Sequence, residues 1–76
     1  MENQFSLIYG QENISYNICF IQGNVKVKRR LLDLGFINTK VKIIKKSRFK
    51  GVFLLEIRKY VLALKKREVA NIIVEV

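Results

Sequence analysis

The sequence contains no histidine and a single cysteine, Cys19, among its 76 residues. Histidine is the commonest general base and metal ligand, and one thiol with six scattered acids cannot supply a tetrahedral zinc site or a ferrous site from one chain. A free cysteine between core-type residues is more often a small buried hydrophobe than a nucleophile. The sequence therefore predicts no catalytic residue, no intrinsic metal centre and no cofactor.

Proline is absent and glycine is scarce. The four glycines, Gly10, Gly23, Gly35 and Gly51, stand alone, and none begins the glycine-rich turn from strand to helix that cradles a phosphate. If a nucleotide is involved, we expect a partner protein to bind it.

Long apolar runs are also lacking. No run approaches the roughly 18 to 20 residues that span a bilayer, and the first ten residues lack the basic patch and apolar stretch of a signal peptide. A single cysteine cannot form an internal disulfide, which agrees with a reducing compartment. We expect one cytoplasmic domain that covers residues 1–76.

Acidic residues are rare in the middle of the chain. All 15 Lys and Arg residues lie between Lys26 and Arg67, where Asp33 and Glu56 alone oppose them, so this segment carries a net charge of +13 within a chain of +9. Such a field favours an anionic partner, whether acidic protein, lipid headgroups or nucleic acid. The alternative is a solvated face that keeps a small domain soluble.

One helix is predicted within residues 26–36. Val27, Leu31 and Leu34 fall on one helical stripe. Asn24 precedes them as a candidate N-cap, and Gly35 stands where the helix should end in a left-handed residue.

Apolar alternation predicts about five short strands. In residues 14–21 we expect Ile14, Tyr16, Ile18 and Phe20 to point into the core. The other strands are expected near residues 40–46, 52–58, 60–64 and 72–76. Short strands with one helix after the first fit a mostly β fold, a small partly open β-barrel.

Nucleic-acid binding is one hypothesis for the basic segment, since small barrels that bind single strands combine basic tracks with exposed aromatic side chains. Phe49 and Tyr60 are the two candidate stacking platforms. Two platforms are few, and we therefore favour a protein partner over nucleic acid.

Several stretches together resemble the FeoA family, small cytosolic accessory proteins of bacterial ferrous iron transport. The stretches are RRLLDLGF, KVKIIKK, EIRKYVLAL and REVANIIVEV, and the likeness covers about residues 7–76. This resemblance implies an SH3-like β-barrel with a helix inserted after the first strand. It also implies a non-enzymatic function, in which the protein binds and modulates a FeoB-type GTP-dependent membrane transporter by docking on its cytosolic GTP-binding domain. Related SH3-like domains occur at the ends of metal-dependent repressors, so the fold alone leaves open a regulatory module of an unrelated system.

Two groups of residues are candidates for binding a partner. The first lies on the helix and comprises Arg29, Arg30 and Asp33. The second lies around an expected hairpin connection and comprises Lys45, Lys46, Arg48, Phe49 and Lys50. This basic hairpin is a rival docking surface, for the partner or for the anionic inner face of the cell membrane.

Overall fold

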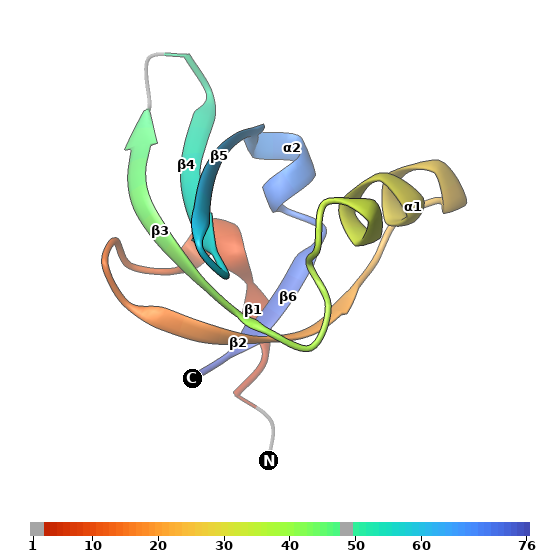
Figure 1. Ribbon diagram of the computed structural model, residues 1–76, viewed down its shortest axis with the longest axis horizontal. Coiled ribbons are helices and arrows are strands. Elements are labelled where there is room, and N and C mark those ends of the chain that lie inside the picture. Colours follow the sequence, from red (N-terminus) through yellow and green to blue (C-terminus); the bar gives the residue numbers. More distant parts are fainter. Residues whose placement is uncertain (1–2, 48–49) are drawn as a thin grey trace.

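The computed structural model describes residues 3–47 and 50–76, which form one curved sheet with a main helix beside it (Figure 1). The elements in chain order are β1 (Phe5–Ser6), the 3-10 turn η1 (Leu7–Tyr9), β2 (Ser15–Ile21), α1 (Val25–Asp33), β3 (Lys40–Ser47), β4 (Val52–Ile57), β5 (Tyr60–Lys65), α2 (Lys66–Val69) and β6 (Ile72–Glu75). These described residues thus contain six strands, and the one added to the predicted five is β1, from the amino-terminal arm. No helix among them is both long and apolar enough to cross a bilayer.

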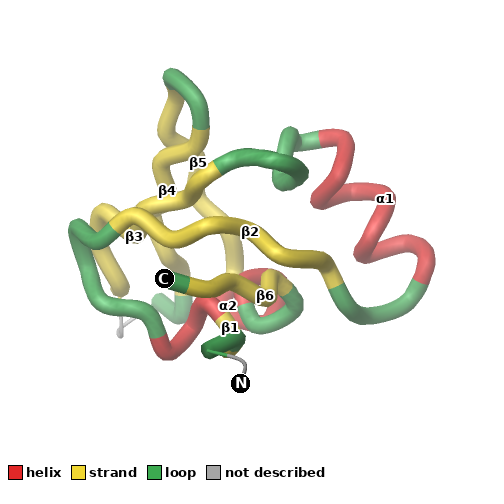
Figure 2. Tube along the Cα trace, turned by 90° about the horizontal axis from the view of Figure 1, so that it is seen from below, coloured by secondary structure: helices red, strands yellow, loops and turns green. Residues whose placement is uncertain are grey.

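The sheet has the strand order β1-β6-β2-β3-β4-β5, and every neighbouring pair is antiparallel. β2 pairs with both β6 and β3, and α1 stands at one end of the sheet (Figure 2). β1 and β5 are the two edges of the sheet as described, so it curves like a barrel without closing. The predicted mostly β class, with one helix after the first long strand, is confirmed.

The core is apolar and draws on the strands, both helices and η1. The buried cluster comprises Leu7, Tyr16, Ile21, Leu31, Phe36, Val41, Ile43, Phe53, Leu55, Ile57, Leu64, Val69, Ile72 and Val74. No charged or polar side chain is buried in the described part of the chain. Burial of apolar area is therefore the main stabilising contribution.

The inner face of β2 changes at a β-bulge, where the pairing with β6 shifts between Ile18 and Phe20. Before the bulge Tyr16 is buried, as predicted. Beyond it the extra residue reverses the faces, so that Phe20 is 49% exposed and Ile21 is buried. The prediction that Phe20 points into the core is wrong, because strict alternation assumes uninterrupted pairing. Ile14 precedes β2 and is exposed as well.

α1 begins and ends as the sequence predicts. The Asn24 side chain accepts a hydrogen bond from the Val27 N–H at 2.9 Å, which caps the first turn. At the other end Gly35 has a φ of 103°, its N–H donates to the Leu32 carbonyl at 3.0 Å, and the Phe36 N–H donates to the Leu31 carbonyl at 3.1 Å. This Schellman arrangement turns Phe36 into the core, where it is fully buried.

The turn between β4 and β5 holds the end of α1 against the sheet. The Arg58 guanidinium donates to the Ile37 carbonyl at 3.1 Å, and the Tyr60 hydroxyl donates to the Leu34 carbonyl at 2.6 Å. We call these two hydrogen bonds the helix-end clamp. Arg58 has a φ of 51°, a left-handed conformation that is uncommon for residues other than glycine and costs free energy. The clamp offsets part of that cost.

Gly35→Ala is expected to destabilise the fold more than the matched control Gly51→Ala. Both glycines have positive φ, 103° and 63°, so either alanine carries backbone strain of about 1–2 kcal/mol. An added Cβ at Gly35 lies 3.1 Å from the Tyr60 Oη and disturbs the clamp, whereas at Gly51 no described atom lies within 4 Å. Urea unfolding followed by circular dichroism measures both losses, and equal losses would contradict the role given to the clamp.

Candidate functional site

The structure separates the two predicted groups of partner-binding residues. Arg29, Arg30 and Asp33 lie exposed on α1, and we call them the helix surface. The hairpin surface comprises Lys45, Lys46 and Lys50, near the connection between β3 and β4.

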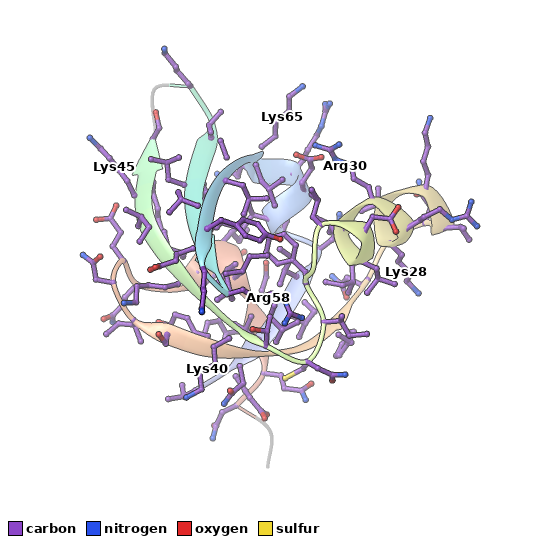
Figure 3. The ribbon with its side chains drawn as sticks, in the orientation of Figure 1. Lys28, Arg30, Lys40, Lys45, Arg58 and Lys65 are labelled. Atoms are coloured by element: carbon purple, nitrogen blue, oxygen red, sulfur yellow. The ribbon has the colours of Figure 1, made fainter. Side chains whose placement is uncertain are left out.

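Figure 3 shows Lys28, the neighbour of Arg29 on α1, and Lys45 on opposite sides of the molecule. The other two predicted residues, Arg48 and Phe49, lie outside the described residues. The two surfaces are therefore separate, and we treat them as alternative docking sites for a partner.

Arg30 has a structural role within the chain. Its Nε donates to the Glu68 Oε2 at 2.7 Å and ties α1 to α2, although the Arg30 side chain is itself 59% exposed. The other oxygen of Glu68 accepts a hydrogen bond from the Lys65 N–H at 3.0 Å and so caps α2. No such bond or ion pair involves the side chains of Arg29 or Asp33 among the described residues, which leaves both available to a partner.

The carboxylate of Glu68 is held in its charged form. Partial burial alone raises the pKa of this carboxyl, but the hydrogen bond from the Lys65 backbone and the Arg30 guanidinium together outweigh burial. The pKa of Glu68 therefore lies below its ordinary value of 4.5.

Lys46 is likewise engaged within the fold. Its Nζ donates to the Ile8 carbonyl at 3.1 Å and lies 5.6 Å from the centre of the Phe53 ring, a cation–π distance. Its backbone N–H donates to the Glu12 carboxylate at 2.8 Å. These contacts fasten the amino-terminal arm to β3, so within the hairpin surface Lys45 and Lys50 are the exposed lysines.

Tyr60 also serves the fold. It is 47% exposed, but its hydroxyl is fixed in the helix-end clamp, so the ring cannot turn outward freely to stack on a base. With Phe49 outside the described residues, the structure gives the nucleic-acid hypothesis no support from either of its two predicted stacking platforms.

The thiol of Cys19 is half-buried on β2. Burial, and after it the negative charge of Glu75, raises the pKa of the Cys19 thiol above its ordinary value, so the reactive thiolate is disfavoured at neutral pH. In the part of the chain that the structure describes, no three His, Cys, Asp or Glu side chains come together as metal ligands.

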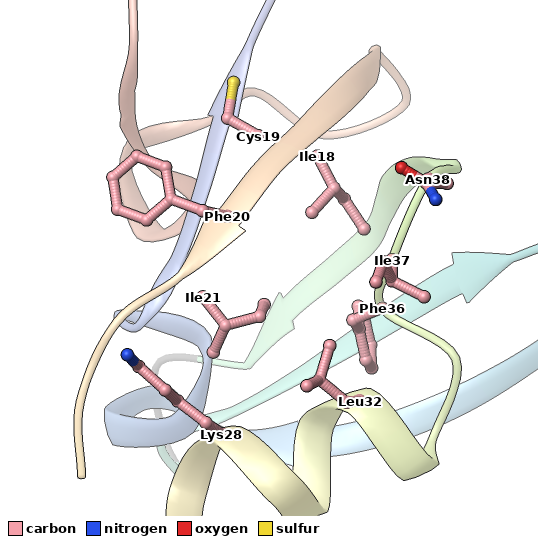
Figure 4. A pocket seen from close by; sticks show the side chains of 9 residues that line it. All are labelled: Ile18, Cys19, Phe20, Ile21, Lys28, Leu32, Phe36, Ile37 and Asn38. Carbon is pink, nitrogen blue, oxygen red and sulfur yellow. The ribbon is translucent and has the colours of Figure 1, made fainter. Parts of the chain in front are cut away.

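An apolar groove between β2 and α1 was not predicted. It has a volume of about 270 Å³. The residues that line it are Ile18, Cys19, Phe20, Ile21, Lys28, Leu32, Phe36, Ile37 and Asn38. We call this hollow the β2–α1 groove. Figure 4 shows Ile18 and Ile21 of β2 facing Leu32, Phe36 and Ile37 across a common space.

The sequence gives a signal for one wall of the groove and none for the other. Leu32 lies off the buried stripe of α1 and is 42% exposed, and Ile37, after the helix end, is 48% exposed. An apolar residue off the stripe is a hint of a binding surface. The bulge in β2, which sets the opposite wall, has no residue signature here.

The chain matches the family model of the FeoA domain over residues 11–76. No curated protein sequence matches it. Among solved structures it is similar to a FeoA-like protein from Clostridium acetobutylicum, with a TM-score of 0.88 and 28% identity over 100% of this chain and 90% of that one. It is also similar to the zinc-complexed FeoA of Stenotrophomonas maltophilia, described as an SH3 domain protein, with a TM-score of 0.73 and 24% identity over 86% and 82% of the two chains.

The same fold occurs in a manganese-dependent transcriptional repressor, with a TM-score of 0.88 and 13% identity. The likeness covers 99% of this chain but 42% of the repressor. At that identity it shows the fold alone. The SH3-like fold is thereby confirmed, and it is shared by proteins of different function.

Glu68→Gln is expected to lower stability near neutral pH and to have little effect in acid. Because the pKa of Glu68 is depressed in the folded state, its stabilising contribution is complete above the unfolded value and is lost as pH falls through the folded value. Urea midpoints measured between about pH 3 and pH 7 should therefore converge at the acid end. A difference between variant and wild type that is the same at every pH would contradict this role of the ion pair.

Proposed function

This chain belongs to the FeoA family, and from that membership we propose that it is a non-enzymatic accessory protein of ferrous iron uptake. The observation that carries the proposal is the family match over residues 11–76, since the family is linked to iron transport. We further propose that it acts in the cytoplasm at the inner face of the cell membrane, where it binds and modulates a FeoB-type transporter.

The proposed partner surface is the cytosolic GTP-binding domain of that transporter. The partner then binds and hydrolyses the guanine nucleotide, and this chain acts by binding to the partner. A change in assembly or nucleotide turnover follows when the chain binds one state of the partner more tightly than another.

The helix surface is our choice for the docking face, in preference to the hairpin surface. Arg29 is exposed and free of bonds to the described residues, and it lies one turn from the apolar Leu32 and Val25, so charge and apolar area coincide there. Lys45 and Lys50 are exposed beside a hollow of about 290 Å³ that includes Lys46 and Phe53, but there Lys46 is already bonded to the fold. We assign these two lysines to an anionic lipid surface, where each lysine contributes about 1 kcal/mol.

The isolated GTP-binding domain of the cognate transporter is expected to bind the chain in at least one nucleotide state. Calorimetric titration without nucleotide, with GDP and with a non-hydrolysable GTP analogue measures the affinities. The affinity should fall as salt rises, because the chain carries a net charge of +9. Arg29→Ala should weaken the complex, whereas Lys45→Ala, which removes the same charge from the other surface, should not. Absence of binding in every nucleotide state, and to the intact transporter, would overturn the proposed function.

A further inference from the structure

We propose that the β2–α1 groove is a docking site whose occupant is an acidic segment of a protein partner, with one apolar side chain inserted between β2 and α1. This inference rests on the proposed function, because it names where and how the transporter's cytosolic part is bound. The proposed function relies on the charge of the helix surface, and this inference adds that the affinity comes from an apolar side chain of the partner that inserts into the groove.

The groove is built from two elements that the core holds firmly. Its floor is Phe36, which is fully buried and fixed by the helix end. One wall is α1 and the loop after it, with Leu32 and Ile37, and the other is β2, with Ile18 and Ile21 (Figure 4). A preformed apolar hollow of this kind can accept a side chain with little loss of conformational entropy in the protein.

The groove continues onto the outer side of α1. A second shallow hollow of about 260 Å³ is lined by Val25, Lys28, Arg29, Leu32 and Asp33, and so shares Lys28 and Leu32 with the first. Val25 is 70% exposed. Contiguous apolar surface with a polar rim is typical of protein interaction sites, in contrast to single exposed apolar residues.

The size of the groove favours a side chain over a free small molecule. Ligand pockets usually enclose about 300–1,000 Å³ and bury most of the ligand, whereas this groove is smaller and open along one side. A groove of this volume is large enough for one apolar side chain of a protein segment. The shallow hollow beside it can accommodate the next turn or strand of the same segment.

The charge around the groove specifies an acidic occupant. Lys28 lies at one end of the groove and Arg29 beside it on α1, while Arg58 bonds to the carbonyl of the lining residue Ile37. The acids there are Asp33 on α1 and Glu75, which lies near Cys19. A second copy of this chain is disfavoured as the occupant, because each copy carries a net charge of +9 and the two would repel. A partner with a carboxylate placed near Lys28 gains attraction and is steered toward the groove.

A matched pair of substitutions tests the apolar anchor. Leu32→Gln removes an apolar side chain from the groove, and Leu54→Gln removes one of nearly equal exposure, 38% against 42%, from β4. Glutamine is tolerated in a helix, and neither leucine belongs to the buried core. Calorimetric titration of each variant with the cognate GTP-binding domain should show affinity reduced about tenfold or more for Leu32→Gln, as for an interface hot spot, and almost unchanged for Leu54→Gln.

A second matched pair tests the acidic nature of the occupant. Lys28→Glu and Lys45→Glu change the net charge of the chain equally, one at the groove and one on the hairpin surface. Lys28→Glu should weaken binding to the GTP-binding domain several-fold more than Lys45→Glu. The difference in affinity between the two variants should become smaller at high salt. Thermal unfolding of all four variants shows whether each remains folded at the titration temperature.

The outcomes separate this inference from the function on which it rests. If the wild type binds the GTP-binding domain but Leu32→Gln binds equally well, or Leu54→Gln loses as much, the groove is not the docking site although the function stands. If the wild type binds no state of the transporter, the function fails and the inference with it. The remaining possible occupant is a second copy of this chain, which analytical ultracentrifugation tests. A wild type that dimerises, with a Leu32→Gln variant that does not, would place a second copy in the groove and overturn the proposal.

Discussion

The end of α1 is the constraint on which the rest of the structure depends. Gly35 takes a backbone conformation that admits Phe36 into the core, and the helix-end clamp then fixes the following loop to the turn between β4 and β5. Because a sheet this small offers little area for a helix to pack on, these few contacts fix the position of α1 relative to the sheet. The β2–α1 groove exists only because α1 is held at that distance from β2.

Intramolecular bonds divide the many cations of this chain into two classes. Arg30, Lys46 and Arg58 each bond to a carboxylate or a carbonyl of the fold. Arg30 joins α1 to α2, Lys46 joins the amino-terminal arm to β3, and Arg58 joins the turn between β4 and β5 to the loop after α1. Lys28 and Arg29 remain exposed beside an apolar hollow. The strong positive charge is thus partly structural, and net charge alone is a poor guide to the binding surface.

The fold was largely predictable from the sequence, and the candidate site was not. Asn24 and Gly35 punctuate α1 by local rules that do not depend on tertiary structure, so both ends were predicted correctly. Phe20 was misplaced because a bulge arises from the pairing of β2 with β6, which no pattern within β2 reveals. The groove could not be predicted for a similar reason. Its two walls meet only in the folded chain, and their lining residues are 7 or more positions apart in the sequence, as between Ile21 and Lys28.

The groove between β2 and α1 is the proposed binding site of the partner. Titration of the isotope-labelled chain with the unlabelled GTP-binding domain of the cognate transporter, followed by amide chemical shifts, tests it most directly. The account predicts that the shifts move around Lys28, Leu32 and Ile37, with Lys45 and Leu54 unaffected. Shifts centred on β3 and β4, with α1 unchanged, would contradict it.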